Sequence, residues 1–151
     1  MKRCRLVYRS IAEPSLLAGS ALDNLVNRSQ ERNSVTGITG LLVLSGNRFL
    51  QVLEGPVGFV NELMAKIIAD KRHSRFELLS YEQSAFPLFH DWSMTVLRLE
   101  EIPTPTRDVL VAKYDLDNGS VRVPDDSLSA HSLLLDARWI CAGRVGESVR
   151  T

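Results

Sequence analysis

Two apolar runs, Leu41–Leu44 and Phe49–Leu53, constrain the fold of this chain more than any other feature. They are separated by Ser45-Gly46-Asn47, whose glycine and asparagine are typical of a tight hairpin turn. The two runs are therefore predicted to be neighbouring antiparallel strands. Gly55-Pro56 ends the second strand and places proline at the start of a helix.

The segments on either side of this hairpin alternate between strand and helix patterns. The predicted elements are a strand at 4–10, a helix from Pro14 to about Asn33, the hairpin, a helix after Pro56, and strands near Phe76–Tyr81 and Trp92–Leu99. The order β-α-β-β-α-β-β predicts a ferredoxin-like α+β fold, in which a five-stranded mixed sheet has two helices on one face.

The chain beyond Leu99 is predicted to form a linker and two further helices. The linker is Glu101–Thr106, which contains two prolines. A short helix is expected near Arg107–Tyr114 and a longer one near Asp126–Cys141. The apolar side of the longer helix is expected to consist of Leu128, Leu134, Leu135 and Ala137, next to Arg138. We expect this helix to cover the sheet face that the first two helices leave bare.

Composition and charge exclude several classes of protein. Eighteen basic and eighteen acidic side chains cancel, so no overall field attracts nucleic acid or an anionic membrane. No apolar stretch is long enough for a membrane span, and the start lacks a signal-peptide pattern. Cys4 and Cys141 have no metal-ligand spacing and are expected to be reduced thiols. We expect a cytoplasmic protein, with one domain at 1–99 and an extension at 100–151.

Gln51 is a polar residue within an apolar strand, where it points to the same side as Phe49 and Leu53. A buried amide without hydrogen-bond partners costs about 1–3 kcal/mol. The polar partners that the sequence offers nearby in the predicted fold are chiefly Tyr8, Ser29 and Asn33. Two interpretations remain open: a private polar network in the core, or a pocket in which two amides and a phenol bind a flat heterocycle.

Trp92 and Met94 lie two residues apart and so on one side of a strand. Their ordinary interpretation is plain core. The functional interpretation is an adaptable wall beside Gln51, because methionine repacks at low cost when its neighbour moves.

A group of charged residues lies on and after the second predicted helix. Lys66 and Asp70 have the spacing of a surface ion pair, and Arg72 and His73 suit the negative end of a helix dipole. The alternative is a site for an anionic cofactor tail. No nucleophile–base–acid set, metal-ligand spacing or phosphate-binding loop is visible in the sequence, which therefore gives no positive case for an enzyme.

Taken together, these residues resemble the BLUF domain, a blue-light sensor that uses flavin. The resemblance covers roughly residues 3–98 and consists of blocks in the family's order: Tyr8-Arg9-Ser10, Ser29-x-x-Arg32-Asn33, Gly37-Ile38-Thr39-Gly40-Leu41-Leu42, Phe49-Leu50-Gln51-Val52-Leu53-Glu54-Gly55, Asp70-Lys71-Arg72-His73 and Phe89-x-x-Trp92-Ser93-Met94. The tail is similar, less specifically, to the two-helix extension of short, stand-alone PixD-like BLUF proteins.

The resemblance implies a non-covalent flavin, FAD or alternatively FMN, between the two helices. It implies that Tyr8 donates an electron and a proton to the excited flavin, and that Gln51 is the amide that switches between Tyr8 and the flavin. The other implied switch residues are Asn33 at the ring edge, Ser29 near the switch, and Trp92 and Met94, which pass the signal on. The implied cofactor contacts are completed by Arg32, Lys66, Asp70, Arg72 and His73.

The resemblance therefore predicts a photoreceptor rather than an enzyme. The residues after Leu99 are too few for a cyclase or phosphodiesterase domain, so we expect a separate downstream partner, for which a response-regulator-like protein is one candidate. A homodimer or larger ring is also expected. Two alternatives are a flavin-free ferredoxin-like interaction module and a small flavin oxidoreductase.

Overall fold

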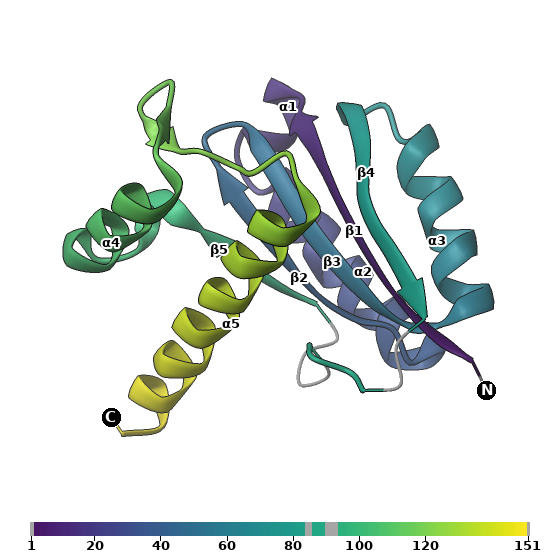
Figure 1. The fold of residues 1–151 in the computed structure, drawn as a ribbon. Coiled ribbons are helices and arrows are strands. Elements are labelled where there is room, and N and C mark those ends of the chain that lie inside the picture. The colour runs from purple at the N-terminus through teal and green to yellow at the C-terminus, as the bar shows by residue number, and fades with distance from the viewer. Residues whose placement is uncertain (1, 84–85, 90–93, 151) are drawn as a thin grey trace.

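The computed structural model describes residues 2–83, 86–89 and 94–150, with side chains as far as residue 143. A five-stranded sheet lies at its centre, in the spatial order β4-β1-β3-β2-β5 (Figure 1). Its strands are β1 (Arg3–Ala12), β2 (Thr39–Ser45), β3 (Arg48–Pro56), β4 (His73–Gln83) and β5 (Thr95–Arg98). The helices are α1 (Pro14–Leu17), α2 (Ala21–Thr36), α3 (Val57–Ala69), the 3-10 turn η1 (Leu99–Glu101), α4 (Thr104–Tyr114) and α5 (Ser127–Arg150). A small hairpin, β6 (Leu116–Asp117) and β7 (Ser120–Val121), separates α4 from α5.

The pairing of the strands confirms the predicted mixed sheet. β1 runs antiparallel to both β3 and β4, and β2 runs antiparallel to β3. β5 pairs with β2 in the parallel direction. Gly46 lies in the turn between β2 and β3 with a φ of 59°, a left-handed conformation that glycine adopts without a steric penalty.

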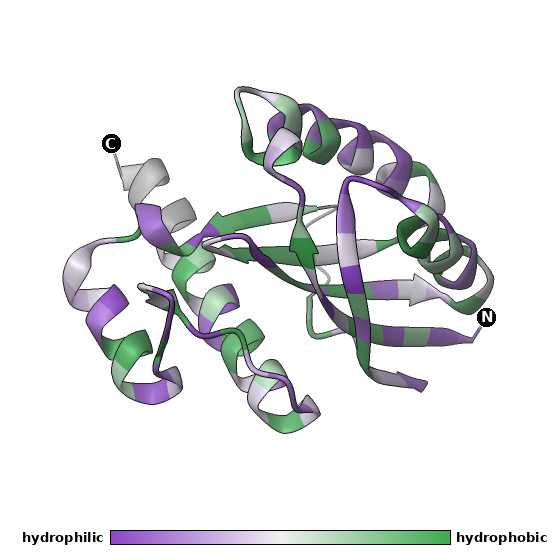
Figure 2. Ribbon diagram, turned by 90° about the horizontal axis from the view of Figure 1, so that it is seen from above, coloured by the Kyte–Doolittle hydropathy of each residue, from purple (hydrophilic) through white to green (hydrophobic). Residues whose placement is uncertain are grey.

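Helices cover both faces of the sheet, as predicted. Figures 1 and 2 show α2 and α3 on one side and α5 on the other. Alternation along β1 divides the core into two layers, since Leu6 and Tyr8 point toward α2 and α3 while Val7 points toward α5. Within the described part of the chain, none of the helices has the length and apolar character needed to cross a bilayer.

Three predicted helices have different bounds in the structure, and one of them is α5, which continues to Arg150 rather than ending near Cys141. The single helix expected from Pro14 is divided into α1 and α2, because Gly19 has a φ of 56° and this left-handed conformation cannot continue a right-handed helix. The helix α4 begins at Thr104, inside the segment predicted to be a linker. Pro105 does not prevent this, since a proline in the first turn lacks only an N–H that has no partner within the helix.

The buried side of α5 also differs in two positions from the predicted one. Leu134 is completely buried against the sheet, whereas Leu128 and Leu135, which were predicted to lie on the same side, are 83% and 43% exposed. Leu134→Ala should lower the free energy of unfolding by about 2–5 kcal/mol because it opens a cavity in the core. Leu128→Ala is the matched control and should change it by less than about 0.5 kcal/mol. Urea unfolding measures both, and equal effects would contradict the burial of Leu134.

Candidate functional site

A cavity of about 250 Å³ lies between the sheet and the helices α2 and α3. Its apolar lining is formed by Leu16, Leu25, Val26, Leu42, Phe49, Leu63, Ile67 and Met94. Its polar lining is formed by Tyr8, Ser29, Arg32, Gln51, Lys66, Asp70, Arg72 and His73. Apolar walls with a small set of convergent polar groups are typical of a small-molecule site.

Tyr8 and Gln51 form the polar centre of this cavity. They are directly opposite each other in the pairing of β1 with β3, so both side chains point to the same side of the sheet. The Tyr8 hydroxyl donates a hydrogen bond to Gln51 Oε1, and Gln51 Nε2 lies 3.5 Å from Met94 Sδ as a donor. Tyr8 and Gln51 are only 4% and 7% exposed. The amide is therefore held between a phenol and a thioether.

The surroundings of Tyr8 keep its phenol neutral. Burial raises the pKa of Tyr8, and the negative charge of Asp70 raises this pKa further. The ring of Phe76 stacks on the Tyr8 ring with the centroids 4.7 Å apart. The hydroxyl thus retains its proton at physiological pH and remains a hydrogen-bond donor.

Met94 is held from two directions. Besides its contact with Gln51, its carbonyl oxygen accepts a hydrogen bond from Gln30 Nε2 at 2.8 Å. Gly40 gives the methionine its space: a Cβ at that position would lie 3.3 Å from Met94 Cε and 2.5 Å from the Val52 carbonyl oxygen. Sequence reasoning missed Gln30, because a polar residue on a helix does not differ in pattern from its exposed neighbours.

Three polar residues of α2 lie beside these groups. Ser29 lines the cavity and donates to the Leu25 carbonyl oxygen at 2.9 Å. Arg32 also lines the cavity, and its partial burial lowers the pKa of its guanidinium. Asn33 is 1% exposed and its Oδ1 accepts from Arg32 Nε at 3.3 Å, but among the described residues it does not belong to the cavity lining. The predicted contact of Asn33 with a ligand therefore stays a prediction.

The end of α3 supplies the charged part of the lining. Asp70 pairs with Arg72, whose Nε and terminal nitrogen lie 3.0 and 2.6 Å from the carboxylate oxygens, and this hydrogen bonding holds the pKa of Asp70 below its usual range. His73 has both ring nitrogens engaged: Nε2 donates to the Ile67 carbonyl oxygen, so Nδ1 accepts from the Ser10 hydroxyl at 2.8 Å. His73 therefore shapes the wall, and its predicted contact with phosphate remains untested. Trp92 lies outside the described residues.

The family model for BLUF, sensors of blue-light using FAD, matches residues 4–95. The chain belongs to the BLUF family. This confirms the predicted family and fold class, and it makes the matched region a flavin-binding blue-light sensor rather than an enzyme.

Relatives of known role share this BLUF region. The photoactivated adenylate cyclase subunit beta of Euglena gracilis is 36% identical over 101 residues, which are 66% of this chain and 12% of that protein. The BluF antirepressor of Escherichia coli, described as regulated by blue light and temperature, is 31% identical over 96 residues, or 62% of this chain and 23% of its own length. The chain thus matches only a small part of these relatives.

Solved BLUF structures have the same fold. BlrP1 of Klebsiella pneumoniae, determined with FMN and cyclic diGMP, has a TM-score of 0.63 and 36% identity over 68% of this chain and 27% of that one. BlsA in its photo-activated state has a TM-score of 0.64 and 27% identity over 75% of this chain and 79% of that one. The second match extends over most of both chains, which supports the five-stranded architecture described above.

Proposed function

We propose that this chain is a blue-light receptor that holds FAD non-covalently in the cavity beside Tyr8 and Gln51 and passes its signal to a separate protein. The observation that supports this most directly is the hydrogen bond from the buried Tyr8 hydroxyl to Gln51 at the cavity wall. A phenol and an amide at this wall provide an electron donor next to a group with two bonding patterns.

The residues present fit a flavin. The apolar walls suit a flat ring system, and the three cationic side chains of the lining, Arg32, Lys66 and Arg72, suit phosphate groups. Asp70 is the one carboxylate among the described lining residues and suits the hydroxyls of a ribityl chain. The family description supports FAD, while the FMN bound to BlrP1 makes FMN the alternative.

The chemistry of the switch follows from these two side chains. A bound flavin would supply a photo-oxidant under blue light, and Tyr8, whose phenol lines the cavity, would be the residue that gives up one electron. An oxidised phenol is a strong acid, so Tyr8 releases its proton to Gln51 Oε1, to which it is already hydrogen-bonded. Return of the electron and proton restores Tyr8, and Gln51 is left rotated or as its tautomer. Because each exchanged hydrogen bond is worth about 1 kcal/mol, the lit state reverts in darkness.

We further propose that the signal leaves through a protein contact made by a homodimer or larger assembly in the cytoplasm. The sensor would comprise residues 1–99, and 100–151 would be its output extension. Three exposed apolar side chains on α5 support a contact surface there, since spacings of seven and four residues place them along one side of a helix. They are Leu128, Leu135 and Trp139, which are 83%, 43% and 81% exposed. A response-regulator-like protein is one candidate partner.

An absorption spectrum before and after blue light tests the proposed function. The purified protein should be yellow and should show a red shift that reverses in darkness, and chromatography of the released flavin distinguishes FAD from FMN. Colourless protein that binds no added flavin would favour the interaction module. Continuous consumption of NAD(P)H without a reversible shift would favour the oxidoreductase.

A further inference from the structure

A second polar pair joins β1 to β3 on the sheet face opposite the cavity. Arg5 is opposite Glu54 in the same strand pairing that places Tyr8 opposite Gln51. On β1, Arg5 and Tyr8 are three residues apart, and on β3, Gln51 and Glu54 are three residues apart. Because successive side chains of a strand alternate between the two faces, residues three positions apart point to opposite faces of the sheet. The separation along the strand is about 10 Å. The same two strands therefore hold the photoactive pair and an ion pair.

Glu54 is a buried acceptor for Arg5 and for the backbone of the short described segment 86–89. Its carboxylate is 1% exposed, and it accepts hydrogen bonds from Arg5 Nε and from the Leu88 backbone N–H, both at 2.9 Å, and from the Phe89 backbone N–H. Met94 follows Phe89 by five residues and contacts Gln51 in the cavity. Glu54 thus binds residues 88 and 89, while the switching amide of Gln51, three positions away on the same strand, contacts Met94.

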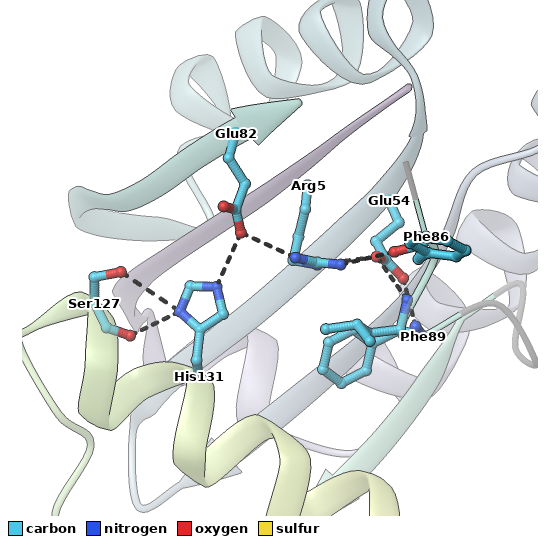
Figure 3. A network of polar contacts seen from close by, with 8 residues as sticks. Arg5, Glu54, Glu82, Phe86, Phe89, Ser127 and His131 are labelled. Atoms are coloured by element: carbon cyan, nitrogen blue, oxygen red, sulfur yellow. Dashed lines mark hydrogen bonds and ion pairs between the residues drawn. The ribbon is translucent and has the colours of Figure 1, made fainter. Parts of the chain in front are cut away.

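Further polar contacts, through Glu82, connect the Arg5–Glu54 ion pair to α5 (Figure 3). Arg5 also donates to Glu82 of β4 at 2.9 Å and to the Phe86 carbonyl oxygen at 3.0 Å. His131 of α5 points its Nε2 at the same Glu82 carboxylate from 3.7 Å. The other ring nitrogen, Nδ1, lies 2.7 Å from the Ser127 carbonyl oxygen in the first turn of α5.

The contact between His131 and Glu82 is the adjustable step in this chain of contacts. His131 Nε2 is buried and has no hydrogen-bond partner among the described residues. Its distance from Glu82 is slightly beyond that of a hydrogen bond. A displacement of a few tenths of an ångström is enough to form this bond or to remove the contact. The contacts of Arg5 and Glu54 described above are already at hydrogen-bond distance.

We propose that Glu54 is a positioning residue for the light reaction, and that through Arg5 and Glu82 it couples the Tyr8–Gln51 contact to the first turns of α5. This inference rests on the proposed function, because it needs Gln51 to change its bonding in light. Gln51 and Glu54 lie three residues apart on β3, and Tyr8 and Arg5 lie three residues apart on β1, so a changed contact between Tyr8 and Gln51 shifts the two strands at the Arg5–Glu54 pair. The ion pair transmits that displacement to Glu82 and alters how firmly His131 holds α5 on the sheet.

The chain offers a closely matched pair of variants for the test. Glu82 and Glu77 both lie on β4, are about half exposed, and pair with an arginine of β1, Arg5 and Arg9 respectively. Only Glu82 also faces His131. Glu82→Gln therefore interrupts the proposed coupling, whereas Glu77→Gln removes an equivalent surface ion pair outside it. Neither substitution touches the cavity lining or the buried Glu54.

Amide hydrogen exchange of the full flavin-loaded chain, in darkness and under blue light, measures the coupling. The wild type and Glu77→Gln should show a light-induced change of exchange in residues 127–134. Glu82→Gln should keep the red shift and reduce that change by about three- to tenfold, the factor that one altered hydrogen bond is worth. Glu54→Gln should alter the rate of dark recovery by a similar factor and keep flavin bound.

The outcomes separate this inference from the proposed function. A wild-type protein with no red shift refutes the proposed function and, with it, the coupling. A normal red shift combined with equal exchange changes in Glu82→Gln and Glu77→Gln refutes the coupling alone. The coupling is also refuted if the wild type shows the red shift without any light-induced change in residues 127–134.

Discussion

Tyr8→Phe should abolish the light-induced red shift while the protein stays yellow. The substitution removes one hydroxyl, so the packing against Phe76 and the shape of the cavity are retained. It removes both the hydrogen bond to Gln51 and the only proton that the ring has to release. Flavin absorption measured before and after blue light should then be superimposable, with flavin content equal to that of the wild type.

Tyr81→Phe is the control for this experiment. Tyr81 is 39% exposed, donates its hydroxyl to Asn61 Oδ1 at 2.8 Å and does not belong to the described cavity lining. Its variant should show the full red shift. A normal shift in Tyr8→Phe would remove Tyr8 from the mechanism, and loss of the shift in both variants would point to an effect that does not depend on the cavity.

The fold was predictable where the pattern is local. The hairpin around Gly46 and the two apolar strands beside it follow from turn chemistry and from runs of apolar residues, and both are present in the structure. The division of the first helix at Gly19 was missed because a glycine within a helical pattern is often tolerated. The exposure of Leu128 and Leu135 was missed because helical spacing alone does not fix which side of α5 faces the sheet.

The site was predictable where side-chain alternation and the family resemblance agree. Gln51 and Tyr8 share one side of the sheet, and the structure brings them into contact. The ion pair of Arg5 with Glu54 was not predicted, since its partners are 49 residues apart and meet only through the register of β1 on β3. No local pattern distinguishes these two charges from exposed strand residues.

Glu54→Ala should lower the free energy of unfolding by about 3–5 kcal/mol, because it removes the buried partner of the Arg5 guanidinium, which keeps only its contacts with the half-exposed Glu82 and with backbone such as the Phe86 carbonyl oxygen. The backbone N–H groups of Leu88 and Phe89 also lose their acceptor. Urea unfolding at a fixed flavin concentration measures the change. Glu77→Ala, which removes a carboxylate that is about half exposed, should cost no more than about 1 kcal/mol. Equal losses in the two variants would show that burial of the Arg5–Glu54 pair is not what stabilises this part of the sheet.

The double variant Arg5→Met, Glu54→Leu should recover part of that loss, since apolar side chains of similar size can replace a buried ion pair without leaving an unpaired charge. The recovery should be incomplete because Leu88 and Phe89 still lack an acceptor for their N–H groups. If the double variant is more stable than Glu54→Ala yet lacks the light-induced change of exchange in α5, then stability and coupling depend on different properties of the pair. Burial of any well-packed side chains would then suffice for the fold, whereas the signal would require the hydrogen bonds that only the charged pair makes.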